Sequence, residues 1–188
     1  MSRAVKRYIT VMALLLAAVL AASAYLLAAG YIARRMHPTQ YADQVSVSAD
    51  EFGVPRSVIF AVIKTESSFR PDVVSTAGAV GLMQITPDTF DWLQFKSGEK
   101  YNAAELYKPE VNIRYGTMLL AALYDEFGRW DTAYAAYNAG LNRVRMWLSN
   151  PEYSDGIGLK NIPFGETDRY VKKVEKAVLE YKRLYKLD

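Results

Sequence analysis

An uncharged segment from Tyr8 to Ala33 constrains the fold most strongly. It is rich in Leu, Ala and Val and contains no Asp, Glu, Lys or Arg. As an α-helix it would be roughly 35–40 Å long, which is enough to cross the hydrocarbon core of a bilayer with some tilt. The sequence therefore predicts one transmembrane helix at residues 8–33, between a short segment of residues 1–7 and a linker of residues 34–40.

A cleavable signal peptide is the alternative for this segment, because Ala21–Ala24 resembles a cleavage site. The apolar run continues through Leu26, Leu27 and Ile32, beyond the usual length of a signal-peptide core, which favours an uncleaved signal anchor. Three basic side chains precede the span and two follow it: Arg3, Lys6 and Arg7, then Arg34 and Arg35. This bias favours a cytoplasmic N-terminus, a single pass, and an extracytoplasmic position for the rest of the chain.

Charge and residue types exclude several classes of function for the part beyond the membrane segment. Removing the five flanking cations from the 23 basic residues leaves 18 against 20 acidic residues, so this part is not a basic nucleic-acid-binding module. There is no cysteine, and the single histidine, His37, lies in the linker. Histidine catalysis and the usual zinc sites are therefore not expected, and neither a metal nor another cofactor is predicted.

Glu66 is the candidate catalytic residue. Val58, Ile59, Val62 and Ile63 recur at helical spacing, and Glu66 continues the same apolar stripe. A carboxyl directed towards the core side of its helix is desolvated, which raises its pKa as a general acid near neutral pH requires. The alternative is a structural glutamate at a helix end or paired with an arginine.

The remaining pattern predicts a mainly helical domain, because no segment has a convincing strand pattern. Thr86 and Pro87 have the residue types of an N-cap and a first helical position. The residues around Gly98 and those from Asn150 to Pro163 are predicted loops. The predicted helices cover residues 41–52, 55–66, 88–93, 109–127, 131–137 and 143–148, and a last helix begins near Glu166.

Four motifs occur in a fixed order along residues 41–185. They are Glu66-Ser67-Ser68-Phe69, the small-residue stretch from Ser75 to Ile85 that ends in Gly-Leu-Met-Gln-Ile, Ala136-Tyr137-Asn138-Ala139-Gly140, and Ile162–Thr167 with Tyr170. With these motifs the chain resembles the catalytic domain of the soluble lytic transglycosylase family. The resemblance implies a lysozyme-like fold over residues 41–188 and, as partner, the glycan strands of bacterial peptidoglycan.

The resemblance also implies roles for particular side chains. Glu66 matches the catalytic acid and base. Ser75 matches a serine whose hydroxyl lies near the substrate N-acetyl group, and Met83 and Gln84 match residues that line the sugar cleft. The other matched residues are expected along the cleft floor and beside the catalytic carboxyl: Tyr137, Asn138, Glu166 and Tyr170.

Cleavage of a glycosidic bond usually needs a second carboxylate opposite the acid. Near Glu66 the sequence offers Asp72, Asp88 and Asp91, each of which fits a turn or a helix start, so the substrate itself is expected to supply the nucleophile. By resemblance, the C6 hydroxyl of N-acetylmuramic acid attacks its own anomeric carbon and leaves a 1,6-anhydro end. A hydrolytic muramidase of the goose-type lysozyme kind is one alternative. A non-catalytic, membrane-anchored glycan-binding or assembly protein is another.

Overall fold

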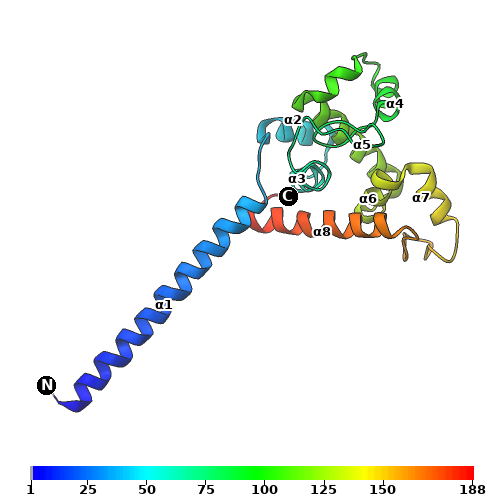
Figure 1. Cartoon of the computed structure of the whole chain (residues 1–188). Coiled ribbons are helices and arrows are strands. Elements are labelled where there is room, and N and C mark those ends of the chain that lie inside the picture. Colours follow the sequence, from blue (N-terminus) through cyan, green and yellow to red (C-terminus); the bar gives the residue numbers. More distant parts are fainter. Residues whose placement is uncertain (1) are drawn as a thin grey trace. The chain divides into compact units, whose positions relative to one another are not determined.

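The computed structural model describes residues 2–188, which form one unit ending at Pro38 and a second unit, Thr39–Asp188 (Figure 1). The first unit is helix α1 (Arg3–Met36), whose first turn is capped by the hydroxyl of Ser2. Within residues 2–188, α1 is the one helix that is long and apolar enough to cross a membrane, a property that membrane anchors and signal sequences share. Its side chains are almost all exposed.

The second unit is built from helices, and within residues 39–188 extended pairing is limited to isolated bridges such as Ser154–Leu159. The prediction of a mainly helical domain is confirmed. Its elements are α2 (Ala42–Phe52), α3 (Arg56–Glu66), α4 (Pro87–Ser97), the 3₁₀ helix η1 (Ala103–Tyr107), α5 (Pro109–Phe127), α6 (Trp130–Ala139), α7 (Leu141–Leu148) and α8 (Gly165–Tyr185).

Local sequence signals explain most helix ends. Thr86 caps α4, because its hydroxyl accepts a hydrogen bond from the backbone N–H of Thr89 and Pro87 occupies the first turn. Gly53 and Gly128 end α2 and α5 in the left-handed conformation, which glycine adopts without steric cost.

Several helix boundaries differ from the sequence expectation: α6 ends at Ala139 rather than at residue 137, and α7 begins at Leu141 rather than at residue 143. Helix α4 continues beyond residue 93 to Ser97 and stops only at Gly98, which is left-handed; Lys96 lies over the ring of Trp92, one turn earlier, and supports this last turn. Helix α6 begins at Trp130, so Asp131 lies inside its first turn rather than capping it. There the carboxylate of Asp131 accepts hydrogen bonds from Thr132, which is a favourable place for an anion.

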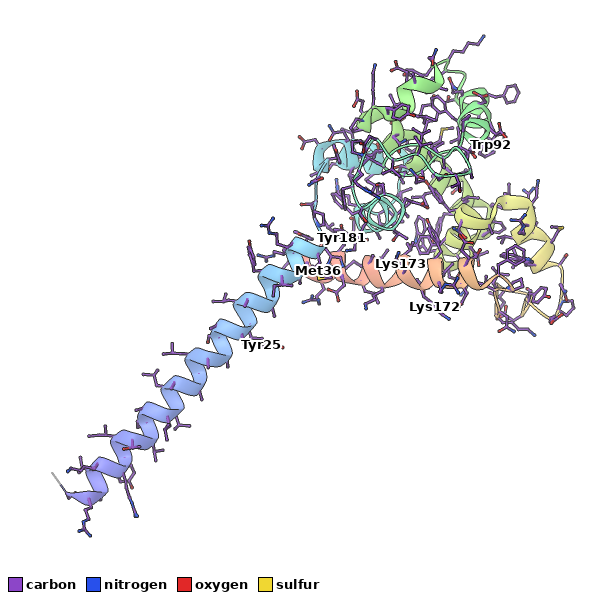
Figure 2. All side chains as sticks on the ribbon, viewed as in Figure 1. Tyr25, Met36, Trp92, Lys172, Lys173 and Tyr181 are labelled. Carbon is purple, nitrogen blue, oxygen red and sulfur yellow. The ribbon has the colours of Figure 1, made fainter. Side chains whose placement is uncertain are left out.

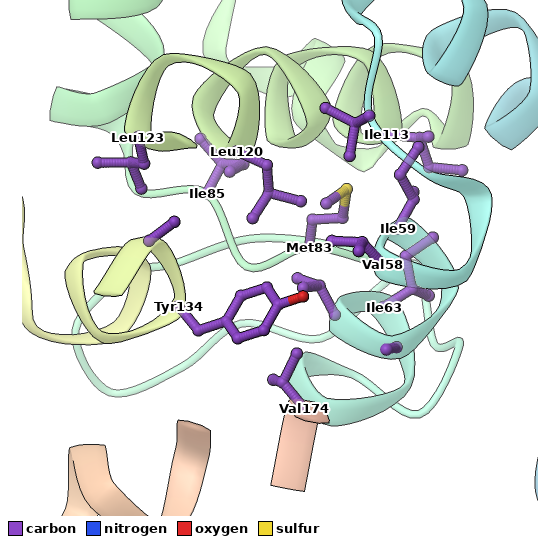
Figure 3. Packing of buried hydrophobic residues seen from close by; sticks show 14 of the residues in the cluster. Val58, Ile59, Ile63, Met83, Ile85, Ile113, Leu120, Leu123, Tyr134 and Val174 are labelled. Atoms are coloured by element: carbon purple, nitrogen blue, oxygen red, sulfur yellow. The ribbon is translucent and has the colours of Figure 1, made fainter. Parts of the chain in front are cut away.

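The core lies where α3, α5, α6 and α8 meet the segment between α3 and α4. Figure 3 shows Val58, Ile59 and Ile63 of α3 beside Met83 from that segment, and all four are at most 2% exposed. Around them lie buried residues of the other helices: Ile113, Leu120, Tyr134 and Val174. Because α3 packs against α8, and α6 packs against α8 as well, the C-terminal end of α3 faces the first turns of α8 (Figure 1).

Candidate active site

The carboxyl of Glu66 is the last side chain of α3 and is held by a tyrosine from α8. The phenol of Tyr170 donates a hydrogen bond to Oε1 of Glu66 at 2.6 Å, across 104 residues of sequence. The next residue, Ser67, fixes the end of α3 from the other side, because its hydroxyl donates to the carbonyls of Leu82 and Ile63. The position of Glu66 is thus defined by three segments of the chain.

Burial raises the pKa of Glu66 from 4.5 to about 7. The hydrogen bond from Tyr170 and the positive charge of Lys173 both oppose this rise, because they stabilise the carboxylate. Burial also raises the pKa of Tyr170 and of Tyr137 well above the usual range of a phenol, and the charge of Glu66 adds to both increases. The two phenols are therefore hydrogen-bond donors, and Glu66 is the group that exchanges protons near neutral pH.

Glu66 opens into a pocket of about 530 Å³, here called the Glu66 pocket. Its lining comes from the ends of α3 and α6 and from the first turns of α8: Thr65, Glu66, Asn138, Glu166, Arg169, Tyr170 and Lys173. A pocket of this volume can take part of a sugar chain, and each of its lining residues carries a polar or charged group that can contact sugar hydroxyls.

Asn138 and Tyr137 link α6 to the rest of the site. The side-chain oxygen of Asn138 accepts a hydrogen bond from the buried hydroxyl of Thr167 at 2.8 Å, which holds the end of α6 against the start of α8. The phenol of Tyr137 donates to the backbone carbonyl of Met83 at 2.7 Å. Tyr137 therefore ties α6 to the segment that follows α3.

That segment is ordered by Asn112 of α5, which is 1% exposed. The side-chain oxygen of Asn112 accepts a hydrogen bond from the backbone N–H of Met83, and its amide donates to the carbonyls of Val80 and Leu106. Gly81 has φ +80°, and a Cβ there would collide with Asn112, so this close approach requires glycine.

The predicted site residues fall into two groups. Asn138, Glu166 and Tyr170 line the pocket around Glu66, and Tyr137 lies near enough to respond to its charge. The other three, Ser75, Met83 and Gln84, do not line this pocket. Their contacts hold the Ser75–Ile85 segment in its conformation instead. The hydroxyl of Ser75 accepts from the N–H of Ala79, Met83 is fully buried, and Gln84 donates to the carbonyls of Val73 and Gly81.

Five residues around the site were not among the predicted site residues: Thr65, Asn112, Thr167, Arg169 and Lys173. Helical periodicity from Glu166 and Tyr170 gives the signal for the two cations, because positions 166, 169, 170 and 173 share one face of α8. Thr167 lies in the motif Ile162–Thr167, but its hydrogen bond to Asn138, 29 residues away, does not follow from the sequence. Asn112 carries no sequence signal, since the Met83 backbone that it holds is also 29 residues away.

A second hollow, of about 320 Å³, adjoins the other side of α6 and is here called the Trp92 pocket. Tyr137 lines it together with Asp88 and Trp92 of α4, and apolar residues of α5 form its wall. The C-terminal end of α6 thus contributes neighbouring residues, Tyr137 and Asn138, to two different pockets. This arrangement suits a ligand that extends over several units.

Comparison with known proteins gives one consistent group of relatives. Residues 43–157 match the family model described as the transglycosylase SLT domain. The soluble lytic murein transglycosylase of Escherichia coli K12 is 40% identical over 126 residues, which are 64% of this chain and 20% of that protein. The membrane-bound lytic murein transglycosylase C of Pectobacterium atrosepticum is 30% identical over 178 residues, which cover 81% of this chain and 49% of that protein.

Solved structures agree with this result. The 70 kDa soluble lytic transglycosylase of Escherichia coli matches with a TM-score of 0.73 and 35% identity over 80% of this chain and 25% of that one. An inactive glutamate-to-glutamine variant of the lytic transglycosylase of Pseudomonas aeruginosa matches with a TM-score of 0.70 and 34% identity, over 78% of this chain and 24% of that one. The predicted lysozyme-like fold is thereby confirmed. This chain spans between a fifth and a half of the length of these relatives, and the family model covers more than half of it: the protein belongs to the transglycosylase SLT domain family.

Proposed function

We propose that this protein is a membrane-anchored lytic transglycosylase that cleaves the β-1,4 bond between N-acetylmuramic acid and N-acetylglucosamine in peptidoglycan. The observation that carries the proposal is the Glu66 carboxyl, whose pKa of about 7 and position in an open pocket suit a general acid. The names of the relatives support the reaction class. The inactivity of the Pseudomonas aeruginosa glutamate-to-glutamine variant supports a glutamate as the essential group.

In the proposed reaction, neutral Glu66 donates its proton to the departing O4 as the bond from O4 to the anomeric carbon breaks. The C6 hydroxyl of the same muramic acid then forms the new bond to that carbon and gives its proton to the Glu66 carboxylate. The sugar leaves with a 1,6-anhydro end, and Glu66 returns to its neutral form. Attack within one ring has a large effective-concentration advantage over attack by water.

The neighbours of Glu66 suit both halves of this cycle. Tyr170 and Lys173 stabilise the carboxylate that exists between the two proton transfers, whereas burial keeps the resting acid neutral. Asn138 and Glu166 line the pocket and offer polar contacts to sugar hydroxyls. Tyr137 would contribute by holding the Met83 backbone beside the site, a positioning role that it shares with Ser75 and Gln84.

A hydrolytic muramidase is the second candidate, because Glu166 places a second carboxylate in the Glu66 pocket. In that reaction a water molecule, positioned by Glu166, would attack the anomeric carbon in place of the C6 hydroxyl. By contrast, neither Asp72 nor Asp91 lines the Glu66 pocket, and Asp88 lines the Trp92 pocket instead.

Product analysis after digestion of purified peptidoglycan tests the proposal. We expect anhydro-muramic ends, lighter than hydrolysis products by one water, about 18 Da by the stoichiometry of the two routes. The new ends should carry no label when the reaction runs in oxygen-18 water. Glu66→Gln should fold but lose roughly 100-fold or more of the activity, because an amide cannot donate the proton. Reducing, labelled ends as the main product would establish the hydrolase instead.

The proposed location of the protein is the membrane, with residues 8–33 as an uncleaved signal anchor and residues 1–7 in the cytoplasm. The helix α1 and the membrane-bound relative support the anchor, and the basic residues before the span support the orientation. In this topology residues 34–40 form the linker and residues 41–188 form the catalytic domain on the extracytoplasmic face, where peptidoglycan lies.

A further inference from the structure

Two cations of α8, Arg169 and Lys173, line the Glu66 pocket without an ion partner. Both side chains are exposed, and among residues 2–188 neither makes an ion pair within 4 Å. They lie one turn apart on the same face of the helix. The guanidinium of Arg169 lies over Gly165, where an added Cβ would be 3.4 Å from it, in ordinary contact.

Lys172, the residue before Lys173, is a surface cation of α8 that does have an ion partner. The ammonium of Lys172 pairs with Asp168 at 2.7 Å and lines a different hollow, beside Asp131 and Glu175. Lys172 and Lys173 are adjacent in sequence on α8 (Figure 2), yet they face different surroundings. Only Lys173 belongs to the pocket that contains the candidate catalytic carboxyl.

A third cation, Lys64, lies near Lys173, outside the lining of the pocket. The pKa of Lys64, on the last turn of α3, is lowered by burial and by the charge of Lys173, so the two ammonium groups lie close enough to repel. Two anions line the same pocket: Glu66, and Glu166, which lies one turn before Arg169 but makes no ion pair with it within 4 Å among residues 2–188. Glu66 is half-protonated near pH 7, and Glu166 lies two turns of α8 from Lys173, about 10 Å along the axis.

We propose that Arg169 and Lys173 form an anion-binding site at the rim of the Glu66 pocket and hold a carboxylate of the glycan substrate. The inference rests on the proposed function and names the group that the site recognises. Arginine and lysine bind carboxylates by charge-assisted hydrogen bonds, and the guanidinium can engage both oxygens. A muramic acid residue carries such a group either as its free lactyl carboxylate or, where a stem peptide is attached, as the carboxylates of that peptide.

Affinity measurements on the full-length protein in detergent test this assignment, with Glu66→Gln in every sample to prevent turnover. Three tetrasaccharide probes are compared: a neutral N-acetylglucosamine tetramer, a peptide-free muramic acid strand with free lactyl carboxylates, and the same strand with stem peptides. The double substitution Arg169→Gln and Lys173→Gln removes both charges. Lys172→Gln is the matched control, since it removes the adjacent charge outside the pocket.

We expect the double variant to bind at least one carboxylated probe about tenfold more weakly, a change of about 1.4 kcal/mol, and to bind the neutral tetramer as before. The probe that loses affinity identifies the source of the carboxylate. Unchanged affinity for the neutral tetramer also reports that the variant is folded. Binding of that carboxylated probe should also depend less on salt concentration in the double variant than in the parent. Lys173→Arg keeps the positive charge and should retain the affinity of the parent for this probe.

Equal losses for neutral and carboxylated probes, or no loss for either carboxylated probe, would overturn the anion site and leave the proposed function standing. An equal loss with Lys172→Gln would also overturn it, because general surface charge would then explain the effect. Failure of all three probes to bind the parent Glu66→Gln protein would overturn the proposed function, and this inference with it.

Discussion

At neutral pH the carboxyl of Glu66 carries less charge in the folded chain than in the unfolded one. The pKa of Glu66 is about 7 in the folded chain and 4.5 when the residue is free of its folded surroundings. Between pH 4.5 and pH 7 the unfolded chain therefore binds fewer protons than the folded one. The favourable contribution of protonated Glu66 is fully present below pH 4.5, and it is lost as pH rises through 7. The carboxyl therefore costs stability above pH 7.

Glu66→Gln should consequently stabilise the protein at pH 8 relative to the parent, by about 1–3 kcal/mol after allowance for the partial exposure of the residue. The gain should shrink between pH 7 and 4.5. Urea unfolding of both proteins at several pH values measures it, with exposed Glu152→Gln as the control. A gain that is the same at pH 5 and pH 8 would contradict the raised pKa.

Tyr170→Phe should shift the alkaline limb of the pH–activity profile to higher pH. The hydrogen bond from Tyr170 stabilises the carboxylate and so lowers the pKa of Glu66, and its removal raises that pKa. Because the acid must start protonated, activity then persists to higher pH, although its maximum falls. The profile of kcat/KM measures the limb. Tyr107→Phe, at an exposed position, is the control, and a shift to lower pH would exclude this role for Tyr170.

At the scale of elements, α5 orders the Gly81–Ile85 segment through one buried amide. Asn112→Ala would leave the N–H of Met83 and the carbonyls of Val80 and Leu106 without their buried partner. We expect a loss of about 2–4 kcal/mol in the free energy of unfolding. Urea denaturation measures the loss, with Asn161→Ala on the exposed loop as the control. If Asn112→Ala loses less free energy of unfolding than Asn161→Ala, water must replace the hydrogen bonds that Asn112 makes to the backbone.

Helices were predictable from the sequence wherever their ends or faces are determined by residues that are close together in the chain. The caps at Thr86 and Gly128 and the apolar face of α3 are of this kind, and each is found in the structure. The placement of Glu66 on that face followed from spacing alone. The apolar spacing of α5 fits its buried face only in part, because Ile113, Tyr115 and Leu120 are buried whereas Met118 and Leu119 are only partly buried.

Contacts between distant segments lay beyond the reach of local patterns. Thr167 and Asn138 meet across 29 residues, and nothing in either neighbourhood specifies the other. Lys173 was missed for a different reason: a lysine at a solvent-exposed helical position has the same local pattern whether it lines a pocket or pairs on the surface. Only the packing of α8 against α3 separates it from Lys172.

At the scale of the whole molecule, α1 should retain the protein in membranes. Its mean hydropathy of 2.4 over the best window and its length predict integral insertion. The full-length chain should stay in the membrane pellet after high-salt and carbonate washes, and external protease should digest the part beyond residue 40 in spheroplasts. A chain that begins near Pro38 is the control. Recovery of a free mature protein that begins near Tyr25 would show that the segment is a cleaved signal peptide.

The 104 residues between Glu66 and Tyr170 set an order of events during synthesis. Glu66 leaves the ribosome long before α8, so a nascent chain carries the acid without the phenol that orients it and without the cations at its rim. Under the proposed function, the chain therefore becomes able to cleave peptidoglycan only after nearly all of it has been translated. Ribosome-released chains that stop before Gly165 should accordingly be inactive on peptidoglycan, and activity in them would disprove this dependence.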